Sequence, residues 1–173
     1  MGRYVRKNQH CSKVMRWRVT VQESDAAAVH ALVCETGFFS KSEERIAIEL
    51  VEETLSLGKE SGYEFVFADV PGNPGRLLGY TCYGPIPDTE SSFDLYWIAV
   101  APAEQRTGLG SSLLHETERL ALLQNAKRMF VDTSGREQYT PTRKFYERMG
   151  YREEARLVDF YAPGDDKVIY AKT

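Results

Sequence analysis

Apolar residues recur along this chain with two periods, one typical of strands and the other typical of helices. Residues 17–21 alternate apolar and polar side chains, which predicts a first strand. A helix is expected after Ser24 and Asp25, which can cap its first turn. A second is expected after Ser40, which forms a capping-box pair with Glu43. The apolar residues expected on the buried faces of these two helices are Val29, Leu32, Val33, Ile46, Leu50, Val51 and Leu55.

The rest of the chain alternates strands with helices. Aromatic and β-branched residues predict the strands, and proline-glycine segments predict the turns between them. Strands are expected over residues 63–70, 77–83, 93–100, 129–133, 151–161 and 168–171, and helices over 108–124 and 141–150. This order predicts an α/β fold, in which helices are layered on a mixed sheet of about seven strands.

The composition is typical of one globular domain. The 173 residues are enough for a single core, and we expect residues 1–14 to be a flexible tail and residues 15–173 to form the domain. A net charge of −3 disfavours a nucleic-acid partner, and no stretch is long and apolar enough to span a membrane. Cys11, Cys34 and Cys82 show no paired spacing, so we expect reduced thiols in a cytoplasmic protein.

The most informative segment joins a strand to the long helix. Gly108 and Gly110 lie where this helix opens, and glycine lets the backbone come close to a ligand. Free amides in the first turn of a helix, together with the helix dipole, favour an anion. Arg106 adds a positive charge, and Ser111 and Ser112 add hydroxyl donors. The segment is a candidate phosphate site, although two glycines also occur at ordinary loop-to-helix junctions.

Two nucleotide-binding motifs compete for this segment. A Walker loop has Lys after its final glycine, where this chain has Ser111. A dinucleotide fingerprint has a third glycine where this chain has Leu113, and its strand leads directly into the first glycine, whereas seven residues intervene here. Asp132 lies at a sequence distance that suits the acidic residue of that fingerprint, so a dinucleotide such as NAD stays an open alternative.

A third pattern fits better. Gln105–Gly110 reads Q-x-x-G-x-G after a strand that ends in I-A-V, with Pro102 in the loop, and Phe145–Tyr151 reads F-Y-E-R-M-G-Y. In this order and spacing, the two segments resemble motif A and the late helix of the GNAT superfamily of acyl-CoA-dependent N-acyltransferases. The resemblance covers roughly the last half of the chain, and the order of the earlier elements also matches. It implies a mostly antiparallel mixed sheet with helices on both faces.

The resemblance implies that acetyl-CoA is the cofactor and that a primary amine of a small molecule attacks it directly, through a tetrahedral intermediate. The Ile98 amide would stabilise the oxyanion. The family often has Asn seven residues before the tyrosine of the late helix; this chain has Tyr139 there, and Thr133 offers a hydroxyl nearby. The residues expected to contact CoA are Ile98, Ala99, Val100, Gln105, Arg106, Thr107, Gly108, Leu109, Gly110, Ser111, Ser112, Thr133 and Tyr139.

Two side chains are candidates for catalysis. Tyr146 stands where the family often has its general acid, and a phenol with a pKa of about 10 can protonate a thiolate with a pKa of about 8.5. Packing beneath the cofactor is the alternative role for this tyrosine. Asp94 would remove the amine proton, bind the substrate ammonium, or be a solvated acid at the strand end. Alternation along the strand puts Tyr96 and Ile98 on the same face as Asp94.

The acceptor amine is expected to meet an aromatic and acidic lining. Tyr96 would line the cleft beside Asp94. Phe38 and Phe39 lie between the first two helices, where the family usually builds its acceptor pocket, and Glu35 is near in sequence. Such a lining suits a cationic amine, although core packing is the alternative for the two phenylalanines.

Other functions and sites stay open at this point. A protein or peptide N-acetyltransferase and a non-catalytic acyl-CoA-binding module are the alternatives to a small-molecule enzyme. His10, His30 and His115 have no partner at metal-ligand spacing, so we expect no metal. Asp165 and Asp166 are expected to shape a hairpin turn. A homodimer is a further expectation, by analogy with such folds.

Overall fold

The computed structural model describes residues 17–173, except for the side chain of Pro74, and the tail predicted over residues 1–14 lies outside the described residues. The strands are β1 (Trp17–Arg18), β2 (Glu64–Val70), β3 (Asn73–Pro85), β4 (Ser92–Val100), β5 (Arg128–Ser134), β6 (Arg152–Ala162) and β7 (Asp165–Lys172). The helices are α1 (Asp25–Thr36), α2 (Lys41–Leu57), α3 (Leu109–Leu123) and α4 (Thr140–Arg148), with short 3-10 helices at Gly58–Ser61, Pro102–Glu104 and Glu137–Tyr139. The predicted order of strands and helices is confirmed. None of the helices in this range is long and apolar enough to cross a membrane.

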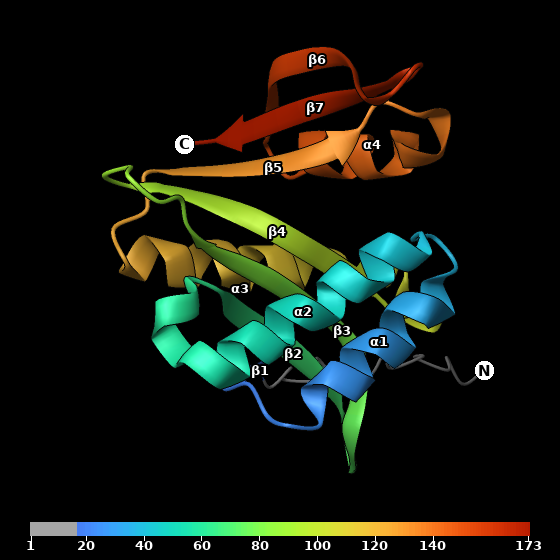
Figure 1. The fold of residues 1–173 in the computed structure, drawn as a ribbon, viewed down its shortest axis with the longest axis vertical. Helices are drawn as coiled ribbons and strands as arrows, with labels where there is room; N and C mark the ends of the chain where they lie inside the picture. The colour runs from blue at the N-terminus through green and yellow to red at the C-terminus, as the bar shows by residue number, and fades with distance from the viewer. Residues whose placement is uncertain (1–16) are drawn as a thin grey trace, which may run out of the picture.

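The strands form one sheet in the order β1-β2-β3-β4-β5-β7-β6. Neighbouring strands are antiparallel except β4 and β5, which run parallel. α1 and α2 cover one face, and α3 and α4 pack into the core on the other face (Figure 1). The sheet is therefore mixed, mostly antiparallel and covered on both faces, as the resemblance implies.

β1 is shorter than the strand predicted over residues 17–21, because it pairs with only two residues of β2. The Arg18 guanidinium pairs with the buried carboxylate of Asp25 at 2.7 Å and with Asp69 of β2 at 2.8 Å. The side chain of Ser24 makes no capping bond. An ion pair with β1, and not a side-chain cap at Ser24, therefore holds the start of α1.

α2 begins as predicted, and part of its predicted apolar face is buried: Val51 lies in the core and Leu50 packs against it. The Ser40 hydroxyl accepts a hydrogen bond from the Glu43 amide at 3.3 Å, and the Glu43 carboxylate accepts one from the Ser40 amide at 2.7 Å. Ile46 and Leu55, which were predicted to be buried, are 44% and 40% exposed. The helix buries a narrow stripe at helical spacing, and apolar residues beside that stripe stay at the surface. The buried residues of α2 are Glu44, Ala47 and Val51.

β4 carries a bulge at Tyr96. In the pairing with β3, Tyr96 falls between Leu95 and Trp97 and has no partner of its own. An extra residue in a strand reverses which face each later side chain takes. Leu95 and Ile98 pack on the core beneath α3 and α4, whereas Tyr96 and Trp97 both pack toward α1 and α2. The prediction that Ile98 shares a face with Asp94 is therefore wrong.

Candidate active site

β4 and β5 are neighbours only where they begin. They pair over residues 92–94 of β4 and 128–130 of β5. β4 then continues to Val100 with β3 as its strand partner, while β5 continues to Ser134 with β7. Figure 1 shows the two strands diverging beyond this joint. Each strand consequently has an unpaired backbone edge, where amides and carbonyls can bind a ligand in place of a neighbouring strand.

The loop after β4 leaves backbone amides free at the start of α3. Within residues 17–173, the amides of Arg106, Gly108, Gly110 and Ser111 donate to no backbone acceptor. Gly108 has a φ of 96°, and its absent Cβ would meet no atom within 4 Å. The Gln105 side chain donates to the carbonyl that ends β4, at 3.4 Å. Free amides in a left-handed turn before a helix form a concave site that suits a diphosphate.

These free amides lie at the end of the unpaired edge of β4. A Cβ on Gly110 would lie 3.7 Å from Cγ2 of Val100 and 3.8 Å from the ring of Phe145 in α4. The first turn of α3 therefore sits against both β4 and α4. We call residues 98–100 and 105–112 the amide flank.

The other residues predicted to contact CoA differ in exposure. Thr107 and Ser112 are exposed, so their hydroxyls are open to a ligand. Leu109, Ala99 and Thr133 are buried. The side chains of Leu109 and Ala99 are part of the core, so only their backbone groups are suited to contact CoA.

Tyr146 lies in the core between α4 and the sheet. The residue is 3% exposed, and its ring centroid lies 5.4 Å from that of Phe145, 5.8 Å from Tyr151 and 6.1 Å from Tyr170. Burial raises the pKa of the Tyr146 phenol well above its usual value. The hydroxyl is therefore protonated at neutral pH, as a proton donor must be, but the same rise makes it a weaker acid toward a thiolate than a free phenol.

Asp94 is the last residue of β4 that pairs with β5, and it is half-buried. Burial raises the pKa of this carboxyl to about 6; the nearby Asp132 carboxylate adds to the rise, and the Lys167 ammonium opposes it. Lys167 itself forms an ion pair with Asp132. An acid with this pKa is mostly ionised at pH 7, yet it is a stronger base than an exposed aspartate.

Aromatic rings from three segments meet on the side of β4 that faces α1 and α2. The ring centroids of Phe38 and Phe39, between α1 and α2, lie 5.4 Å apart. Phe38 lies 4.6 Å from Tyr139, and Phe39 lies 4.9 Å from Trp97. The Tyr139 hydroxyl also donates to the Glu43 carboxylate at 3.4 Å. We call Phe38, Phe39, Trp97 and Tyr139 the aromatic flank.

Several predicted site residues therefore lie in different surroundings from those expected. Tyr139, predicted to contact CoA, packs on Phe38 at the α1–α2 loop. Tyr96, by contrast, stays near Asp94 as predicted: burial and then the Asp94 carboxylate raise the pKa of its phenol to about 12, and its ring also stacks edge-on against Tyr63 at 5.2 Å. Glu35 is exposed on α1.

Sequence reasoning missed four residues that surround these sites. Trp97 was assigned to the opposite face because strand alternation was assumed to run without a bulge. Glu43 was noticed only as a capping residue, and Asp132 only as a ribose-binding acid. Lys167 was noticed only as the end of the segment Asp159–Lys167, which was expected to reach the cleft or a dimer partner, and no local pattern connects it to Asp94.

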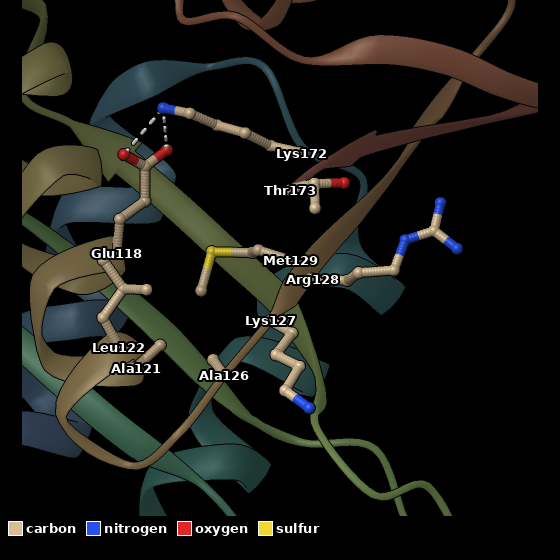
Figure 2. Close-up of a pocket in the computed structure, with 9 residues that line it drawn as sticks. All are labelled: Glu118, Ala121, Leu122, Ala126, Lys127, Arg128, Met129, Lys172 and Thr173. Atoms are coloured by element: carbon tan, nitrogen blue, oxygen red, sulfur yellow. Dashed lines mark hydrogen bonds and ion pairs between the residues drawn. The ribbon is translucent and has the colours of Figure 1, made fainter.

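The cavity in Figure 2 lies at the other end of β5, where β4 and β5 are paired. It has a volume of about 110 Å³, and Lys172 crosses its rim to contact both carboxylate oxygens of Glu118 at 2.9 Å. The cavity is thus separate from the amide flank. Its lining residues are Glu118, Ala121, Leu122, Ala126, Lys127, Arg128, Met129, Lys172 and Thr173.

A sheet that opens between two parallel strands, beside free amides at a helix start, is the architecture of acyl-CoA-dependent N-acyltransferases. Residues 26–151 match the sequence profile of the acetyltransferase (GNAT) family. The chain belongs to this family of acetyltransferases, which confirms the resemblance seen in its two motifs.

Solved structures agree with this assignment. A GNAT-family protein from Desulfovibrio desulfuricans has a TM-score of 0.88 and 47% sequence identity, over 91% of this chain and 98% of that chain. An aminoglycoside 6′-N-acetyltransferase complexed with coenzyme A has the same fold at 16% identity, with a TM-score of 0.69 over 92% of this chain and 97% of that chain. The Escherichia coli ribosomal-protein-S18-alanine N-acetyltransferase has a TM-score of 0.67 at 19% identity, over 90% and 92% of the two chains. No curated protein matches the sequence significantly.

Proposed function

We propose that this enzyme moves the acetyl group of acetyl-CoA to a primary amine of a small molecule. One observation carries the proposal: the free amides at the start of α3 lie at the end of the unpaired edge of β4. The free amides suit a diphosphate, and the unpaired strand edge suits an extended chain with amide groups, such as pantetheine. CoA contains a diphosphate and a pantetheine joined end to end.

The amide flank would hold CoA in two ways. The amides of residues 106–111 bind the diphosphate, helped by the Arg106 side chain and the exposed hydroxyls of Thr107 and Ser112. The pantetheine amides pair with the free edge of residues 98–100, as an added strand would.

Acetyl-CoA supplies a thioester that an amine can attack. Asp94 accepts the proton that the amine must lose before it attacks, directly or through water. The Ile98 amide donates to the thioester carbonyl oxygen while negative charge develops there. A C–N bond forms, the C–S bond breaks, and the Tyr146 hydroxyl gives its proton to the departing sulfur. Solvent then returns a proton to Tyr146.

The aromatic flank and the nearby acids would bind the acceptor. Ring faces attract a cationic ammonium, and Glu43 and Asp94 add negative charge, whereas the charge of Asp132 is paired with Lys167. Phe38 and Tyr139 are in contact with each other, so a ligand that reaches one ring lies close to the other. These features favour a compact amine that carries both positive charge and apolar surface.

A peptide or protein N-terminus is the second candidate acceptor. β6 is an edge strand, and it exposes large apolar side chains that a bound protein would cover. The exposed apolar residues of β6 are Leu157, Val158, Phe160 and Tyr161.

An acceptor screen tests the proposal. Purified protein is mixed with acetyl-CoA and panels of amino acids, polyamines, aminoglycosides and peptides, and free thiol is measured. We expect thiol release with at least one small amine and none with its hydroxyl analogue, because a neutral alcohol lacks both the charge and the nucleophilicity. Mass spectrometry should find one added acetyl group on the amine.

Each of three results would overturn this proposal and indicate another function. Turnover with peptides alone would select the protein N-terminus as the acceptor. A rise in melting temperature with acetyl-CoA, but no turnover with any acceptor, would indicate a non-catalytic acyl-CoA-binding module. Stabilisation by NAD, without any by acetyl-CoA, would indicate a dinucleotide site.

A further inference from the structure

α1 and α2 lie side by side over one face of the sheet, and they share a cluster of three side chains that the acetyl transfer does not use (Figure 1). His30 and Cys34 lie one turn apart on α1, and Glu44 lies in the first turns of α2. One nitrogen of His30, the Cys34 sulfur and one carboxylate oxygen of Glu44 all lie within 4.8 Å of one another. Residues four apart on a helix project from the same face, so the two α1 side chains reach Glu44 together.

We propose that His30, Cys34 and Glu44 form a Zn²⁺ site that joins α1 to α2. Zinc takes nitrogen, sulfur and oxygen ligands in a tetrahedral arrangement, at bond lengths of about 2.0–2.3 Å. Two ligands of one zinc ion therefore lie about 3.5 Å apart. The three ligand atoms already lie within 4.8 Å of one another, and zinc binding would draw them closer, to that separation. Water fills the fourth position.

The surroundings of the ligands suit a divalent cation. A neutral imidazole, a thiolate and a carboxylate carry two negative charges, which Zn²⁺ neutralises. Burial and the neighbouring Glu44 carboxylate raise the pKa of the Cys34 thiol. Zinc binding forms a Zn–S bond and releases the thiol proton to solvent.

Among residues 17–173, Lys41 is the cation that contacts Glu44 and would oppose a bound metal ion. Its ammonium pairs with Oε2 of Glu44 at 2.7 Å, and it lowers the pKa of that carboxyl. The Lys41 side chain is 89% exposed and can move into solvent. The Glu44 carboxylate also accepts a hydrogen bond from the Cys34 thiol, and zinc binding replaces that contact with bonds from the metal to the sulfur and to a carboxylate oxygen.

Metal binding to the untagged full-length protein tests the site. The reduced protein is dialysed against Zn²⁺, and bound metal is measured by mass spectrometry; Co²⁺ is then substituted and its absorption recorded. We expect one equivalent of zinc, a thiolate-to-cobalt band in the near ultraviolet and the strong visible bands of a tetrahedral site. Cys34→Ser should abolish the near-ultraviolet band, and His30→Ala should weaken binding more than about tenfold, since losing an outer-shell partner alone costs about 10–100-fold.

Two control variants separate this site from other ligands. His115→Ala removes an exposed histidine on α3, and it should leave the zinc content unchanged. His10→Ala with Cys11→Ser removes the ligand-type residues outside the described part of the chain, and it should also change nothing. Retention of zinc and of the cobalt band in Cys34→Ser, or their loss only in the His10 and Cys11 variant, would overturn the proposal. Far-ultraviolet circular dichroism of each variant shows that a lost site is not a lost fold.

Discussion

The amide flank and the aromatic flank each include part of β4 but are built in different ways. The amide flank comes from one continuous segment, residues 98–112, and it offers mainly backbone groups. The aromatic flank joins side chains from the α1–α2 loop, from β4 and from the loop before α4. A backbone site tolerates many side chains, whereas a side-chain site changes with each substitution. We infer that the first flank holds the part of the reaction shared by the family and that the second sets the choice of acceptor.

Substitution of Tyr146, which belongs to neither flank, should have the largest effect on the reaction rate. Tyr146→Phe should lower kcat about 1,000-fold, because the departing thiolate loses its proton donor, while the Kd of acetyl-CoA and the KM of the amine change little. Steady-state kinetics and calorimetry measure these values.

Tyr151→Phe is the matched control for that loss. Tyr151 is also buried, its ring centroid lies 5.8 Å from that of Tyr146, and the proposed mechanism gives its hydroxyl no role, so its removal should leave kcat unchanged. Equal losses in the two variants would assign Tyr146 to packing instead of proton transfer.

The pH dependence of the reaction should follow the ionisation of Asp94. We expect kcat/KM to rise with pH through an apparent pKa of about 6, and Asp94→Asn to lower kcat about 100-fold and to remove this limb. If kcat/KM of the Asp94→Asn variant still rises with pH through the same range, Asp94 is not the base.

The same substitution should make the protein more stable. Folding raises the pKa of Asp94 from 3.8 to about 6, so the folded state binds the proton more tightly than the unfolded chain. Stability from this group is complete below pH 4 and is lost as pH rises through 6. Asp94→Asn should therefore raise the free energy of unfolding at pH 8 by about 1 kcal/mol, allowing for partial exposure, and should have no effect at pH 3.5. Urea unfolding at the two pH values measures the difference.

A smaller effect is expected on the amide flank. Gly108→Ala puts a methyl group into a left-handed turn, where it would crowd a bound diphosphate, and we expect the Kd of acetyl-CoA to rise about tenfold. Gly72→Ala is matched, because Gly72 also has a positive φ and open space, but it lies in the β2–β3 turn. Both should lose about 1 kcal/mol of stability, and only the first should lose affinity.

The smallest effect is expected on the aromatic flank. Phe38→Ala removes the ring that contacts Tyr139, and an aromatic contact is worth about 0.5–1.5 kcal/mol, so the KM of the acceptor should rise about fivefold. The Kd of acetyl-CoA should not change. Leu57→Ala, at the exposed far end of α2, serves as the control. A rise in the Kd of acetyl-CoA instead would mean that the two flanks are not independent.

The sequence predicts the parts of the fold that depend on local patterns. The capping box at Ser40 and the order of elements follow from neighbouring residues, and both are present. The bulge at Tyr96 depends on how β4 pairs with β3, which no window of β4 alone contains. The exposure of Ile46 likewise depends on how α2 sits against α1.

The same distinction applies to the candidate site. The amide flank could be located because its glycines and polar residues are consecutive. The contact between Phe38 and Tyr139 could not, because about a hundred residues separate them and an Asn-to-Tyr difference suggested a cofactor contact instead. Side chains that are distant in the sequence and meet only after folding have no characteristic sequence spacing from which their contact could be predicted.

The unpaired edge of β4 has a consequence for solvent exchange. Beyond the bulge at Tyr96, alternate backbone amides point toward β3, and the ones between them point away from it into the opening beside β5. Deuterium should replace the second group quickly and the first group slowly. A molecule lying along this edge would slow only the second group, so the protection pattern would record its position one residue at a time.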